Sequence, residues 1–115
     1  MGIFDVFKSK GIYSSLTGTE KHKMIDKGEL EPLYLISLRF GGSDKLDNIV
    51  YVPSDIVKQK EKIDDELENY MKKGRSIKSY MCIPSYKGKS SIPSKIQIKA
   101  FIDGSEEFVR TIDIW

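Results

Sequence analysis

The two side chains best suited to nucleophilic or metal chemistry, Cys82 and His22, each occur once in this 115-residue chain. A metal site needs several convergent His, Cys or carboxylate ligands, and the sequence has no Cys-x-x-Cys motif and no second His. Cys82 lies among Tyr80, Met81 and Ile83, so we expect a buried, unreactive thiol within a strand. The sequence therefore predicts neither a metal site nor a Cys–His nucleophile.

Paired carboxylates are the second group that could do chemistry. They occur at three places: Asp64–Asp65, Asp44–Asp47 and Glu106–Glu107. General acid–base catalysis needs such a group in an apolar cleft, whereas a solvated helix surface or a turn explains all three. No glycine-rich phosphate-binding loop and no Gly-x-Ser-x-Gly motif accompanies them. We therefore expect no catalytic residues, no cofactor and no enzymatic activity.

Charge is distributed unevenly along the chain. Residues 69–102 hold eight basic residues and no acidic one, although the net charge of the chain is only +2. Basic residues interleaved with aromatic ones on a sheet can bind single-stranded nucleic acid. The same pattern fits an apolar protein interface with a lysine rim, formed with a second copy or with an acidic partner. A third interpretation is that the stretch only balances acidic segments within the folded monomer.

The candidate binding surface combines these basic residues with nearby aromatic and apolar side chains. Its members are expected in the loop before residue 95 or on the outward face of the last two strands: Tyr86, Lys87, Lys89, Lys95, Lys99, Phe101, Val109 and Trp115. In this arrangement Lys95 lies opposite Trp115, within reach of a cation–π contact. Trp115 is either a plug of the core or an interface anchor.

Two short strands are expected to position the first part of the domain. Residues 33–40 predict a strand, because apolar side chains from Tyr34 to Phe40 alternate onto one face. The polar, glycine-containing residues 41–48 predict a turn, and residues 49–52 predict the second strand of a hairpin.

The residues before this hairpin are expected to form a separate segment. Residues 1–30 read as loop-rich with short helices, one of them over residues 20–27. Ile3, Phe4 and Phe7 would share a helical face. We therefore divide the chain into an N-terminal segment, 1–30, and a single α+β domain, 31–115.

Residues 54–73 predict one long amphipathic helix. Ser54 is a suitable N-cap, and Gly74 is a suitable residue after the last turn. The apolar stripe is expected to contain Ile56, Ile63, Leu67 and Tyr70. Charged residues four positions apart form i,i+4 pairs that we place on the solvated face: Lys60 with Asp64, Lys62 with Glu66, and Glu68 with Lys72.

Residues 76–83, 95–103 and 107–115 predict three further strands. The apolar faces of the last two coincide if Ile102 pairs with Phe108 and Ile98 with Ile112. The same register pairs Ile96 with Ile114. It requires a loop of three or five residues around Gly104, with positive φ at the glycine.

The order β-β-α-β-β-β predicts an α+β fold in which the helix, about 54–73, packs on one face of a mainly antiparallel sheet of four to five strands. No apolar run is long enough to span a membrane, and no secretory signal is apparent, so we expect a cytoplasmic location. The excess of Lys over Arg, 16 to 3, and of Ile over Ala, 15 to 1, resembles residue usage in AT-rich bacterial or phage genomes.

The sequence does not specify a function. The leading hypothesis is a non-catalytic interaction module that binds a protein through the outer sheet face and the basic loop. The alternative is a nucleic-acid-binding domain that uses residues 69–102, and the third hypothesis is a small enzyme whose pocket the sequence does not reveal.

Overall fold

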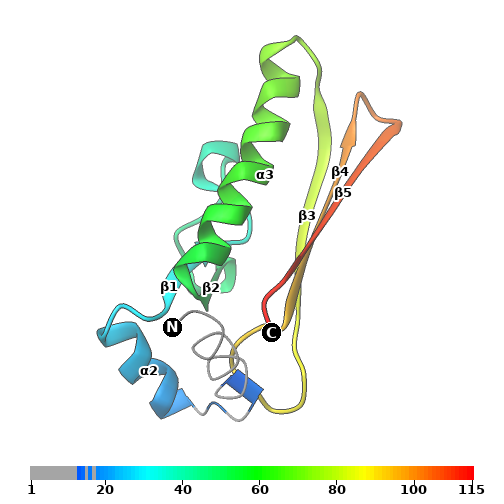
Figure 1. Ribbon diagram of the computed structural model, residues 1–115. Coiled ribbons are helices and arrows are strands. Elements are labelled where there is room, and N and C mark those ends of the chain that lie inside the picture. The colour runs from blue at the N-terminus through cyan, green and yellow to red at the C-terminus, as the bar shows by residue number, and fades with distance from the viewer. Residues whose placement is uncertain (1–12, 15, 17) are drawn as a thin grey trace.

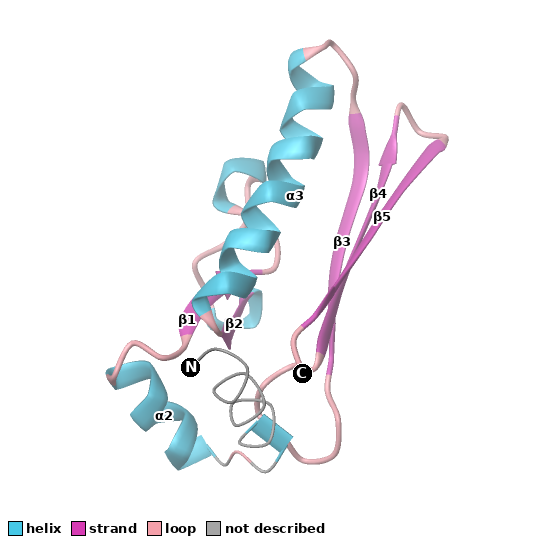
Figure 2. Ribbon diagram, viewed as in Figure 1, coloured by secondary structure: helices cyan, strands magenta, loops and turns pink. Residues whose placement is uncertain are grey.

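The computed structural model describes residues 13, 14, 16 and 18–115, so the expected helical face of Ile3, Phe4 and Phe7 lies outside the described residues. The α+β class is confirmed (Figure 1, Figure 2). The elements follow in the order α2 (Gly18–Asp26), β1 (Glu31–Tyr34), η1 (Leu38–Phe40), η2 (Leu46–Asn48), β2 (Ile49–Val52), α3 (Ser54–Lys72), β3 (Ile77–Ser85), β4 (Lys95–Ile102) and β5 (Glu106–Asp113). Here η denotes a single 3-10 turn.

The described strands form two antiparallel sheets, β1–β2 and β3–β4–β5, so the expectation of one sheet of four to five strands is wrong. Helix α3 contacts both sheets. The ring of Tyr70 on α3 meets Phe108 on β5 edge to face, with centroids 6.3 Å apart. The core joins the small sheet, α3 and the large sheet, with Leu33, Leu67 and Ile98 among its fully buried members.

The expected strand over residues 33–40 ends at Tyr34, and the buried amide of Asn48 explains why. Its Oδ1 accepts from the Ile36 N–H at 2.8 Å, and its Nδ2 donates to the Ile36 carbonyl at 2.9 Å. The Asn48 side chain thus makes the hydrogen bonds with the Ile36 backbone that a neighbouring strand would otherwise make. After Ile36 the chain bends and forms η1. Ile36 and Leu38 are consequently exposed, although their alternation with Phe40 is typical of a strand. The β1–β2 hairpin itself is confirmed.

Helix α3 matches the predicted helix almost residue for residue, but its cap and its buried face differ. Pro53, not Ser54, occupies the N-cap, and its carbonyl accepts from the Ile56 N–H at 3.0 Å. Gly74 follows the helix with φ of 84°, as expected. Fully buried positions are Ile56, Lys60, Asp64 and Leu67, so the Lys60–Asp64 pair lies inside the protein and not on the solvated face.

The β4–β5 pairing is shifted by two residues from the predicted one. Ala100 lies opposite Phe108 and Ile98 opposite Arg110, because the loop consists of residues 103–105; its length of three is one of the two predicted lengths. Asp103 and Gly104 take φ of 56° and 84° in this loop. An even shift leaves each side chain on its face, so the predicted buried and exposed sets are preserved.

Arg75, in the turn before β3, holds this short loop in place. Its Nε donates to Asp103 at 2.9 Å, and its Nη2 donates to Glu106 at 2.6 Å. The Ser76 N–H bond to Asp103 and the bond from Arg75 lower the pKa of that carboxyl below its usual range. The turn after α3 thereby fixes the tip of the β4–β5 hairpin.

Gly42 should tolerate no side chain, because an added Cβ would lie 1.8 Å from the Ile36 carbonyl oxygen. We expect Gly42→Ala to lower the free energy of unfolding by about 2–4 kcal/mol in urea titrations. The matched control is Gly18→Ala, where no heavy atom lies within 4 Å and a change within about 0.5 kcal/mol is expected. Equal effects at both positions would contradict this account of the loop.

Candidate functional site

The outward surface of the large sheet is the leading candidate site. Odd-numbered side chains at positions 79–85, 95–101 and 107–113 point to one side, which we call the outer face. Even-numbered side chains such as Ile96 and Ile98 are buried on the other side. Figure 1 shows α3 and the small sheet on the buried side only. Among the described elements, none covers the outer face.

Three apolar side chains are exposed on the outer face: Met81 by 48%, Ile83 by 45% and Val109 by 37%. Met81, Lys99 and Val109 stand in one row across the three strands. The Lys99 ammonium lies 3.3 Å from Glu107 and 6.0 Å from the centroid of the Phe101 ring. The charged end of Lys99 is thus paired, while its aliphatic stem extends the apolar surface.

Seven of the eight candidate residues from the sequence fall into two groups in the structure. Lys95, Lys99, Phe101 and Val109 lie on the outer face, and Tyr86, Lys87 and Lys89 lie in the exposed loop after β3. Met81 and Ile83 were missed, although the strand Ile77–Ser85 is apolar at both odd and even positions, which is a detectable signal of a second apolar face.

Trp115 does not belong to the outer face. Its indole N–H donates to the Ile92 carbonyl at 3.1 Å, and its half-buried ring packs against the core. Lys87, not Lys95, lies over that ring, with the ammonium 5.5 Å from the centroid. Lys95 lies opposite Asp113, so the predicted Lys95–Trp115 pairing is wrong. The structure therefore places Trp115 as a plug at the end of the sheet.

Several basic residues of the acid-free stretch find acidic partners outside it. Lys72 pairs with Glu68 at 3.3 Å, and Arg75 pairs with Asp103 and Glu106. Lys99 pairs with Glu107. The charge asymmetry of the sequence is thus reduced within the fold.

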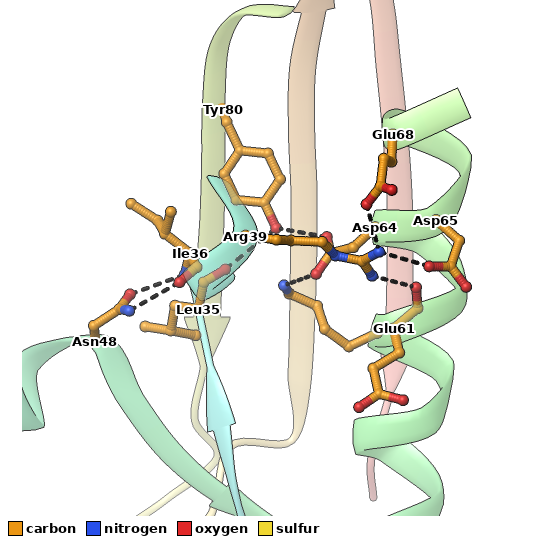
Figure 3. A network of polar contacts seen from close by, with 10 residues as sticks. Leu35, Ile36, Arg39, Asn48, Glu61, Asp64, Asp65, Glu68 and Tyr80 are labelled. Carbon is orange, nitrogen blue, oxygen red and sulfur yellow. Dashed lines mark hydrogen bonds and ion pairs between the residues drawn. The ribbon is translucent and has the colours of Figure 1, made fainter. Parts of the chain in front are cut away.

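Behind the outer face, a buried polar network joins α3, β3 and the segment after β1 (Figure 3). The Lys60 ammonium donates to Asp64 Oδ2 at 2.7 Å, and both residues are almost fully buried. The Tyr80 hydroxyl lies 3.1 Å from Asp64 Oδ1 and 3.2 Å from the Leu35 carbonyl oxygen, so its one proton serves two acceptors. Burial, and then the charge of Asp64, raise the pKa of Tyr80, so the phenol stays a neutral donor.

Arg39 forms an outer layer over this network. Its Nη1 donates to Asp65 at 2.7 Å and to Glu68 at 2.9 Å, and its Nη2 donates to the Glu61 carbonyl at 3.0 Å. The bonds from Arg39 and Lys72 lower the pKa of Glu68. Residue 39 thereby ties η1 to three successive turns of α3.

Tyr80 and Arg39 line a cavity of about 410 Å³, whereas the Lys60–Asp64 pair of this network is less accessible. A cavity of about 170 Å³ between β1 and α3 is lined in part by Lys60, Glu61 and Asp64. Typical sites for small molecules measure about 300–1,000 Å³. Among the described residues, no group of three or more His, Cys, Asp or Glu side chains gathers as metal ligands do. The geometry favours a structural role for the ion pair.

The buried pair should behave as one unit in unfolding experiments. Lys60→Met or Asp64→Leu alone leaves an uncompensated buried charge, and we expect each to cost about 3–5 kcal/mol of unfolding free energy. In the double variant Tyr80 can still donate to the Leu35 carbonyl, so we expect stability within about 1 kcal/mol of wild type. Additive losses in this double-mutant cycle would show that the two charges are not coupled.

Cys82 should be a poor nucleophile in the folded protein. Burial raises the pKa of Cys82 to about 12, and the nearby Lys60 charge offsets this only in part. A thiol with an ordinary pKa of about 8.5 reaches its limiting reaction rate near pH 10. We expect the rate of Cys82 with a disulfide reagent to keep rising about tenfold per pH unit beyond pH 10. A plateau near pH 10 in folded protein would contradict this expectation. Urea-unfolded protein, which should show that plateau, is the control.

Comparisons with known proteins do not extend this description. Within the part of the chain that the structure describes, no helix is long and apolar enough to cross a membrane. No protein-family model matches the sequence, and no curated protein is significantly similar to it.

Proposed function

We propose that this protein is a non-catalytic binding module that engages a protein partner through the outer face of β3–β4–β5. The observation that carries the proposal is the exposure of Met81, Ile83 and Val109 on a sheet face that no described element covers. The three side chains adjoin Lys99 and Phe101 at the spacing of neighbouring strands. Contiguous exposed apolar side chains on a soluble fold favour an interaction surface.

The size of the face indicates how strong such an interaction would be. Three strands about 4.8 Å apart and seven residues at about 3.3 Å each give a surface of roughly 300 Å². A standard interface buries about 800 Å² on each partner. The outer face alone therefore supports a transient complex, and a tighter one would also use the exposed part of the loop after β3, residues 86–89.

The charges on the outer face favour a protein over a nucleic acid. Lys99 is paired with Glu107, and Lys95 lies opposite Asp113, so the two lysines on this face are matched by two carboxylates. Nucleic acids bind through unpaired positive charge, and that binding weakens steeply with salt. The nucleic-acid alternative rests on the loop residues Lys87 and Lys89 and has less support.

The proposal is tested by charge substitution at an apolar residue of the face on β3. We expect Ile83→Glu to fold normally, because the side chain is exposed, and to lose the partner that the wild-type protein captures from its source cell. The control Leu46→Glu alters an apolar residue that is 81% exposed and lies in η2, away from the face, and it should capture the partner unchanged. Captured material should survive nuclease treatment and moderate salt.

Two results would contradict the proposal. One is equal loss of capture in Ile83→Glu and Leu46→Glu. The other is a captured species that nuclease removes and that dissociates as salt is raised, which would favour the nucleic-acid alternative.

A further inference from the structure

We propose that the outer face binds a second copy of this chain, with the two large sheets packed face to face about a two-fold axis. This inference rests on the proposed function, because it names the occupant of the same surface. It comes from the register of the three strands, from the balance of charge on the face and from the state of the sheet edges.

The register places side chains in rows that a two-fold axis can match. One row runs Met81–Lys99–Val109, and the next runs Ile83–Gln97–Thr111. We place the two-fold axis in the plane of the interface, perpendicular to the strands and midway between these two rows. This axis places β3 of one copy antiparallel over β3 of the other. Met81 then faces Ile83 of the second copy, and each such contact occurs twice, as in an isologous interface. The exposed apolar side chains of β3 cover one another.

The outer rows also match under this axis. The row that contains Phe101 is exchanged with the row that contains Lys95, so the lysine of each copy meets the aromatic ring of the other. Such a contact is a favourable cation–π pair. Glu107 and Asp113 come together at the corners, where each has a lysine of its own chain nearby.

Charge balance favours a copy over a strongly acidic or basic partner. The face carries Lys95 and Lys99 against Glu107 and Asp113, so it exerts no net attraction on a highly charged partner. The net charge of the whole chain, +2, produces little repulsion between two copies. The small area of the face predicts a weak dimer, with a dissociation constant on the order of 100 µM.

The sheet edges disfavour the other common way of joining two copies, in which one sheet continues into the next. On β3, Pro84 has no N–H to donate to an added strand. On β5, Glu106, Glu107 and Asp113 are all acidic, so two such edges would repel one another. Face-to-face packing needs no backbone donor from β3, and each carboxylate that it brings together at a corner has a lysine of its own chain nearby.

Sedimentation equilibrium on the full chain, from about 5 µM to about 1 mM, measures the association directly. We expect a monomer–dimer equilibrium for wild type and for the control Leu46→Glu. Met81→Glu and Ile83→Glu should each raise the dissociation constant at least tenfold, because the new carboxylate would face an apolar side chain of the second copy. Circular dichroism would verify that these variants remain folded.

Cross-linking tests the axis itself, in a Cys82→Ser background. A mixture of Met81→Cys and Ile83→Cys chains, treated with a short bismaleimide, should yield more cross-linked dimer than either chain alone. Leu46→Cys should yield none.

The outcomes separate this inference from the proposed function. A monomer at every concentration, or a dimer unaffected by Met81→Glu and Ile83→Glu, overturns the second copy as the occupant. In the former case, capture of another protein that depends on Ile83 would leave the proposed function standing. If the chain neither dimerises nor captures another protein in a way that depends on Ile83, the outer face is rejected as a binding surface.

Discussion

The buried ion pair between Lys60 and Asp64 is the interaction on which the arrangement of the two sheets depends. Removing two charges from water costs several kcal/mol per ion, so the pair is tolerable only with good geometry and further hydrogen bonds. Asp64 meets this condition by binding Lys60 through one oxygen and Tyr80 through the other. Because hydrogen bonds are directional, the pair fixes where β3 lies against α3. Apolar packing alone would specify that position less sharply.

The three arginines of the chain extend the same principle to the surface. Arg39 ties η1 to α3, Arg75 ties the turn after α3 to the β4–β5 loop, and Arg110 ties β5 to Glu66 of α3. A guanidinium suits this task because its planar fork can bind two acceptors at once. The side chains most suited to reading bases or phosphates are thus used to join elements of the fold, which is consistent with a protein-binding role.

The sequence predicted well those features that depend on local pattern. The bounds of α3, the β1–β2 hairpin and the faces of β4 and β5 follow from periodicity and turn residues. Features that depend on packing were missed. The end of β1 at Tyr34 depends on Asn48, twelve residues from the backbone that it binds, and no local pattern reveals that bond.

The buried position of Lys60 and Asp64 was also missed, although the spacing contains a hint. Ile56 and Leu67 are buried on one helical stripe, and positions four residues apart between them must lie on the same stripe. Because charged residues are usually exposed to solvent, the pair was predicted on the solvated face in spite of this spacing. Likewise the outer face was partly found through Lys95, Lys99, Phe101 and Val109, whereas Met81 and Ile83 were read as ordinary strand residues.

The hydroxyl of Tyr80 has a consequence for how the molecule opens. One oxygen on the large sheet is bonded to α3 and to the segment that leaves the small sheet. A two-stranded hairpin as short as β1–β2 has little stability of its own. Since Tyr80 links this hairpin's continuation to the large sheet, we expect the two sheets to open as one cooperative unit, with amide protons in both exchanging through the same opening event.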